Sequence, residues 1–196
     1  MENQNETRIE IKPPINETIN ADSLQLIKYC KEKQFTLAKE MLSTKFIDLE
    51  LQDEAGCTGF HYACIYEDRA LLDLLLDKYI FPHLLEEYIY HDTEHFLCLQ
   101  EMNENKTILH YVSEKNLIEF YNKVELYFPQ KIHNTVNYTT HSGHTALHLA
   151  CEKGNSLILD KIIRITGLEV NKIDCHGNTA LHLACQCSHI EIVKIL

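Results

Sequence analysis

One short motif recurs along the chain, and it limits the possible folds more than any other feature. Residues 143–151 read GHTALHLAC and residues 177–185 read GNTALHLAC, which places Thr145 and Thr179 34 residues apart. Weaker copies lie upstream, GCTGFHYAC at 56–64 and NKTILHYVS at 105–113, and a histidine follows the threonine by three residues in all four. Self-similarity at such a spacing predicts a repeat architecture, in which each unit stacks on its neighbours.

The motif resembles the signature of the ankyrin repeat, T-P-L-H-x-A, which recurs about every 33 residues. The resemblance covers roughly residues 21–196. It implies an all-α fold, an ankyrin-repeat solenoid of stacked helix-turn-helix units with short hairpin loops. The proline of the signature is missing from every copy; the residues in its place are Gly59, Ile108, Ala146 and Ala180.

The residues around the motif fit two helices and a turn in each repeat. The threonine begins the first helix, where its hydroxyl can satisfy a free backbone N–H. Gly154 ends a first helix, since glycine tolerates a positive φ, and Leu147 and Leu181 are expected in the core. Close helix packing is expected at small residues, which are Ala63, Cys64, Ala150, Cys151, Ala184 and Cys185. Second helices are predicted from apolar residues at helical spacing, namely Leu71, Leu72, Leu75, Leu76, Leu157, Ile158, Ile162, Ile163, Ile190, Val193 and Leu196.

The repeats are predicted to follow a disordered leader at residues 1–20, which holds Pro13-Pro14 and few apolar groups. Their predicted bounds are 21–49 for an N-terminal cap, 50–101, 102–138, 139–172, and 173–196 for an incomplete fifth repeat. The cap is predicted from amphipathic positions at Leu24, Ile27, Tyr29, Cys30, Leu37, Met41 and Leu42. The chain stops inside a predicted helix at Leu196, so either the protein continues or something else covers that apolar face.

Two repeats are longer than the family period. The threonines are 49 residues apart between Thr58 and Thr107, and 38 apart between Thr107 and Thr145. The larger excess falls in an acidic, helix-like insertion at 77–101. Insertions in repeat proteins map to one face, often the binding face. The alternative interpretation is a lengthened second helix without a partner.

Composition narrows the class of partner. The net charge is -11, with 29 acidic and 18 basic residues, and this disfavours nucleic acid and anionic membrane surfaces. No signal peptide or spanning segment is recognisable, so we expect an intracellular, cytoplasmic protein (the nucleus included) with eight reduced cysteines. The expected partner is another protein, with a basic patch as the preferred feature, and not a small-molecule substrate.

One cluster of soft ligands needs a separate interpretation. His182, Cys185, Cys187 and His189 lie within eight residues. On one helix these side chains do not converge on a tetrahedral site, and two of them hold repeat positions, so we predict no metal and no cofactor. In ankyrin repeats the motif histidine resembles a structural residue that ties adjacent turns together. Cys57, Cys175 and Cys187 are expected to be exposed, and no catalytic residues are predicted.

The resemblance implies binding on the concave face, formed by hairpin tips and first helices. The family register marks the positions that vary there: Ile65, Tyr66, Glu114, Lys115, Glu152, Lys153, Cys175, His176 and Asn178. Most are polar. Ile65 and Tyr66 form an apolar pair, which either anchors a partner or is buried against the insertion. Acidic residues of the insertion, Glu86, Glu87 and Glu94, are expected to steer a basic partner.

The functional prediction is a non-enzymatic protein–protein interaction module, an adaptor or effector scaffold. GNTALHLAC is also similar to repeats of the NF-κB inhibitors, which sequester a transcription factor. The chain has no D-S-G-x-x-S phosphodegron and no acidic C-terminal tail. A third hypothesis makes it the targeting half of a longer ankyrin-tethered enzyme or receptor.

Overall fold

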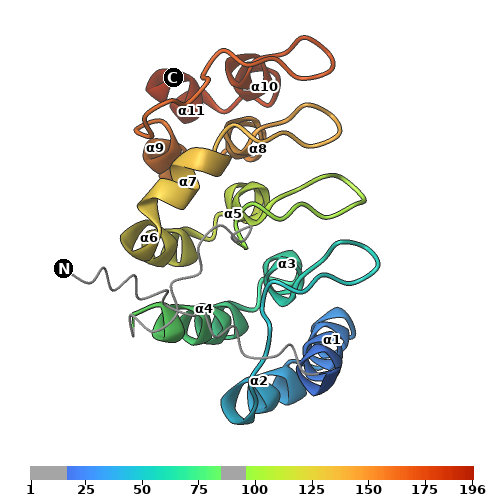
Figure 1. Cartoon of the computed structure of the whole chain (residues 1–196). Helices are drawn as coiled ribbons and strands as arrows, with labels where there is room; N and C mark the ends of the chain where they lie inside the picture. The colour runs from blue at the N-terminus through green and yellow to red at the C-terminus, as the bar shows by residue number, and fades with distance from the viewer. Residues whose placement is uncertain (1–16, 85–95) are drawn as a thin grey trace, which may run out of the picture.

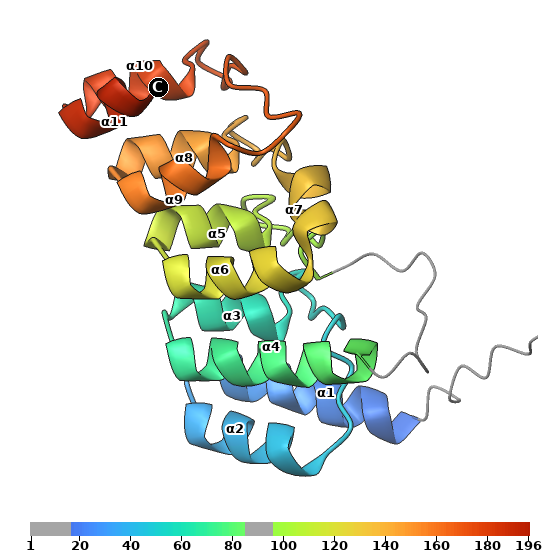
Figure 2. The same cartoon turned by 90° about the vertical axis from the view of Figure 1, so that its left-hand side faces the viewer.

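The computed structural model describes residues 17–84 and 96–196, and side chains in 19–80 and 96–196. The described residues form eleven helices and no strand. Ten of the helices pair, and the pairs stack in chain order with their connecting hairpins projecting to one side (Figure 1). Figure 2 shows the same pairs as successive layers. This is the predicted ankyrin-repeat solenoid.

Each layer consists of a first helix beside the hairpins and a second helix on the outer side. The first helices are α1 (Glu17–Lys31), α3 (Gly59–Ile65), α5 (Ile108–Lys115), α8 (Ala146–Lys153) and α10 (Ala180–Gln186). The second helices are α2 (Phe35–Thr44), α4 (Arg69–Leu84), α6 (Ile118–Tyr127), α9 (Ser156–Ile162) and α11 (Ile190–Ile195). A short helix, α7 (Pro129–Thr135), follows α6.

The threonine of each motif caps its first helix, as predicted. Thr58, Thr107, Thr145 and Thr179 all adopt an extended backbone at the N-cap, and each forms a reciprocal capping box with the histidine three residues later. At the other end of α8, Gly154 has φ 73°, in the left-handed region. The repeated sequence therefore fixes where each first helix begins.

The core runs through all the layers without interruption. Ala63, Cys64, Ala150 and Cys151 are fully buried between neighbouring first helices. Burial raises the pKa of the Cys151 thiol to about 12. Thiols of this kind act as small apolar groups that let helices approach closely.

The stack has two ends, and there the expected burial is wrong. Leu147 is fully buried because α8 lies between the first helices of two other repeats, α5 and α10. Leu181 is 43% exposed because, among the described residues, α10 has a neighbouring first helix, α8, on one side only. Cys185 is exposed for the same reason. In α11 the buried residue is Ile192, and the predicted Ile190 and Val193 are exposed.

The N-terminal cap shows a similar difference. Leu24 and Leu37 are exposed, whereas Leu26 and Ala38 are buried, because α3 and α4 cover only one side of α1 and α2. In α9, Leu157 is also exposed rather than buried. The helix α1 begins at Glu17, before the predicted end of the leader at residue 20.

The two long spacings have different structural causes. The helix α4 has 16 residues, against 10 in α6 and 7 in α9, so a lengthened second helix takes up part of the first excess. Glu86, Glu87 and Glu94 lie outside the described residues. The second excess contains α7, whose first residue is Pro129 and whose Ile132 is buried.

Candidate functional site

The hairpins and the first helices together form one continuous face of the solenoid (Figure 1). Backbone hydrogen bonds join each hairpin to the next: Met102 N–H donates to Ala55 O at 2.8 Å, His141 N–H to Glu104 O at 2.9 Å, and Cys175 N–H to Ser142 O at 2.9 Å. These bonds hold the hairpin side chains in a fixed order along the face.

A carboxylate closes three of the four hairpins; Glu101 and Asp174 are buried, and Asp53 is half-buried. Asp53 and Asp174 each accept two backbone N–H groups, and Glu101 accepts those of Asn103, Glu104 and Lys106 at 2.7 to 3.1 Å. Burial would raise the pKa of Asp174, but the hydrogen bonds from Asn178, His176 and His144 lower it to about 2. The hairpin acids were not predicted, although Asp53 and Asp174 both lie five residues before a motif threonine.

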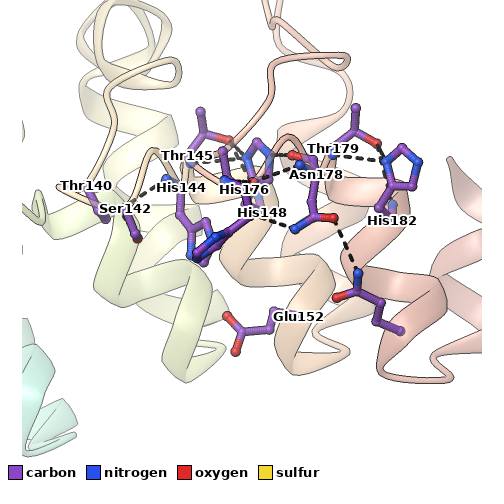
Figure 3. A network of polar contacts seen from close by, with 12 residues as sticks. Thr140, Ser142, His144, Thr145, His148, Glu152, His176, Asn178, Thr179 and His182 are labelled. Atoms are coloured by element: carbon purple, nitrogen blue, oxygen red, sulfur yellow. Dashed lines mark hydrogen bonds and ion pairs between the residues drawn. The ribbon is translucent and has the colours of Figure 1, made fainter.

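The motif histidines tie adjacent repeats together, as the resemblance implied. Nδ1 of His110 and of His148 accepts the N–H of its capping threonine, which leaves Nε2 as the protonated donor. Nε2 of His110 donates to Tyr138 O at 3.0 Å and His144 O at 3.1 Å, and that of His148 to Asn178 O at 3.3 Å (Figure 3).

Burial keeps the most enclosed of these rings neutral. It lowers the pKa of His61 and of His110 to about 4, and it lowers the pKa of His148. Nε2 of His61 makes no hydrogen bond of good geometry among the described residues, although backbone groups of Leu99 and Lys106 partly offset the fall in its pKa. In His110 and His148 both nitrogens are hydrogen-bonded, and these neutral rings are structural links between repeats.

Four of the predicted binding residues lie in two columns along the first helices. Glu114 and Glu152 follow their capping threonines by seven residues, and Lys115 and Lys153 by eight. Their side chains are 19%, 32%, 33% and 43% exposed, in the order Glu114, Glu152, Lys115, Lys153. They lie on the face beside the hairpins and outside the apolar core.

The apolar pair of the same columns is less exposed than expected. Ile65 and Tyr66 are half-buried against the core. The ring of Tyr66 lies 6.0 Å from that of Phe35 and 6.4 Å from that of Tyr62, and its hydroxyl donates to Lys31 O at 3.3 Å. The Tyr66 ring therefore packs on the first repeat, and burial against residues 85–95 of the insertion, the alternative interpretation, lies outside the described residues.

The hairpin of the fifth repeat carries the remaining predicted residues. His176 and Cys175 are exposed, whereas the side chain of Asn178 lies 3.3 Å from Asp174 Oδ2 and from the Gln186 amide. Cys57 was expected to be exposed but is 3% exposed. The next hairpin bonds to Ala55 and lies over this turn.

The cluster near the end of the chain is divided among structural contacts. Nδ1 of His182 accepts the N–H of Thr179, and Nε2 of His189 donates to Glu152 O at 2.9 Å in the previous repeat. Cys185 and Cys187 are exposed. Within the part of the chain that the structure describes, no three His, Cys, Asp or Glu side chains are placed to hold a metal ion.

A polar pocket of about 150 Å³ opens on this face between the third and fourth repeats. Its lining residues are Glu104, Lys106, Glu114, Thr140, Ser142, His144, Leu149, Glu152 and Lys153. Three of the predicted binding residues are among them. The other six were not predicted. All of them except Leu149 lie on the two hairpins, whose sequences differ between the two repeats.

Comparison with known proteins identifies the repeat. Residues 118–196 match the family model described as ankyrin repeats (3 copies). No curated protein matches the sequence. In the described ranges, no helix has the length and apolar character required to cross a membrane.

The first helices of the second and third repeats share the matched capping geometry. The capping boxes at Thr58 and Thr107 precede the matched segment and repeat those at Thr145 and Thr179. Ankyrin repeats are in general a non-enzymatic fold for protein–protein interaction. Residues 118–196 therefore contain ankyrin repeats, and the described fold is an ankyrin-repeat solenoid.

Proposed function

We propose that this chain is a non-enzymatic adaptor or effector scaffold that binds a partner protein on the face formed by its hairpins and first helices. The observation that carries the proposal is the polar pocket on that face. Two of its lining residues, Lys106 and His144, occupy the same register and differ between the two repeats, whereas the capping threonine and the motif histidine are the same in all four motif copies.

The charge of the face supports a partner with a basic patch. The pocket is lined by three carboxylates and two lysines, and the whole chain carries a net charge of -11. Complementary charge speeds encounter and suppresses wrong partners. The buried thiols support a reducing, intracellular location, because Cys30, Cys64 and Cys151 are placed as apolar packing groups.

Site-specific photocrosslinking tests the proposal. A photoreactive amino acid replaces Lys115 or Lys153 on the proposed face, or Leu126 or Leu157 on the outer helices, which are 73% and 58% exposed. The proposal predicts that one and the same protein is crosslinked from both positions of the face and not from the outer positions. Crosslinking from the outer positions alone would place the binding surface elsewhere and overturn it.

A further inference from the structure

The third repeat holds a half-buried lysine between two carboxylates. The ammonium of Lys106 lies 2.6 Å from Glu104 and 2.9 Å from Glu114, and 5.3 Å from the centre of the Tyr111 ring. Its side chain is 12% exposed. Burial would lower the pKa of Lys106, but the hydrogen bonds that its ammonium donates to the two glutamates, and their charge, raise it. This corner of the fold is therefore built to hold an ammonium group.

The fourth repeat has the same carboxylate without the lysine. Lys106 directly precedes Thr107, and the residue in that register before Thr145 is His144. The ring of His144 pairs with a different carboxylate: Nε2 lies 3.3 Å from Asp174 Oδ2, and the ring stacks on that of His148 at 5.7 Å (Figure 3). Glu152, the counterpart of Glu114, therefore receives no ammonium from its own hairpin.

The charge partner that Glu152 does have is weak. Lys153 lies 3.2 Å away, but it is adjacent in sequence and its side chain is 43% exposed. Neighbouring residues of a helix do not face each other, and exposed pairs contribute little. Lys153 can therefore move aside at small cost. The pocket of about 150 Å³ lies between Glu114 and Glu152, and the hydroxyls of Thr140 and Ser142 line its hairpin side.

We propose that this pocket binds the ammonium group of a lysine side chain from the partner protein, with the Glu152 carboxylate as its principal acceptor. The inference rests on the proposed function and names the chemistry of its partner. Lysine offers three donors, and carboxylate and hydroxyl acceptors both line the pocket. Leu149, in the register of Tyr111, would pack against the aliphatic stem of the bound lysine.

The test uses capped lysine (Nα-acetyl-lysine methylamide) as the probe and its Nζ-acetylated form as the uncharged control. Backbone amide shifts of the full chain are followed by NMR as each is added. Saturable shifts at Ser142–His144 and Glu152–Lys153 are expected with capped lysine alone. Glu152→Gln should weaken that binding by about tenfold, as the loss of a charged hydrogen bond does, and circular dichroism should show the fold unchanged.

Glu191→Gln is the matched control, because Glu191 has the same side chain, lies on α11 and is 76% exposed. It should leave the binding unchanged. The proposal is overturned if capped lysine causes no local shifts, if the acetylated form causes equal shifts, or if Glu152→Gln binds as tightly as Glu191→Gln. None of these results affects the crosslinking experiment, so failure here is separable from failure of the proposed function.

Discussion

At the scale of single residues, the motif histidine does two jobs with one ring. Its Nδ1 completes the cap of its own helix, and its Nε2 binds the backbone of the next repeat, as in His110 and His148. Both contacts require the neutral ring. Protonation would convert Nδ1 into a donor and place it against the threonine N–H.

The free energy of unfolding should therefore depend on pH between the folded and unfolded pKa values of these histidines. His61 and His110 have pKa values of about 4 in the folded chain, below the roughly 6.5 of an unfolded histidine. Between these values the unfolded chain binds more protons, so the free energy of unfolding falls as pH falls, by up to about 1.4 kcal/mol per pH unit for each histidine. Urea unfolding at about pH 7 and about pH 5 measures this. Equal or greater stability at the lower pH would contradict the account.

The two motif leucines provide a matched pair for packing. Leu147 is fully buried and Leu181 is 43% exposed, yet both follow their threonine by two residues. Leu147→Ala should cost about 2–5 kcal/mol of unfolding free energy, as truncated core leucines do, and Leu181→Ala clearly less. Thermal or urea unfolding measures both losses. Equal losses would show that Leu147 is not more buried than Leu181, contrary to the structure.

The same pair shows what the sequence can predict at this scale. The threonine–histidine register predicted four helix starts and the ties between repeats, because those contacts are local or lie one repeat away. The motif could not predict that identical leucines differ in burial, because burial depends on whether another layer packs over them. Cys57 was missed for a related reason, since the covering hairpin comes from the following repeat.

At the scale of elements, a carboxylate accepts backbone N–H groups in three of the four hairpins. Glu101 accepts three backbone N–H groups and is 1% exposed. The hairpin so formed carries Lys106 and the Glu104 side of the pocket. Spacing alone predicted the length of this region and not its structure, and the helix α7 in the next repeat was likewise not predicted.

Glu101→Gln should destabilise the chain by about 1–3 kcal/mol, because a buried backbone N–H that loses its acceptor pays the full cost of desolvation. Glu104→Gln on the same hairpin is the control. Its side chain is 63% exposed and pairs with Lys106, so the loss should be within about 1 kcal/mol. Urea unfolding of both variants compares them; a larger loss for Glu104→Gln would refute this role of Glu101.

At the scale of the whole molecule, stacking separates two kinds of position. Repeated residues face the core and hold each layer to the next, while variable residues occupy the face of hairpins and first helices. The sequence predicted the solenoid because the repeated residues carry it. It predicted the face from register, but not the pocket, since a pocket depends on side chains from two repeats that are far apart in sequence.

The affinity of the crosslinked partner tests the central claim, that this face binds protein. Glu114→Gln/Glu152→Gln removes two carboxylates from the face, and Glu125→Gln/Asp160→Asn removes two from the outer helices, where they pair with Lys161 and Arg164. For Glu114→Gln/Glu152→Gln, the dissociation constant should rise by a factor that corresponds to at least about 2 kcal/mol. For Glu125→Gln/Asp160→Asn, it should stay within about twofold of the value for the unmodified chain, as expected for exposed pairs away from the interface. An unchanged constant for the first variant together with a weakened second would contradict the account.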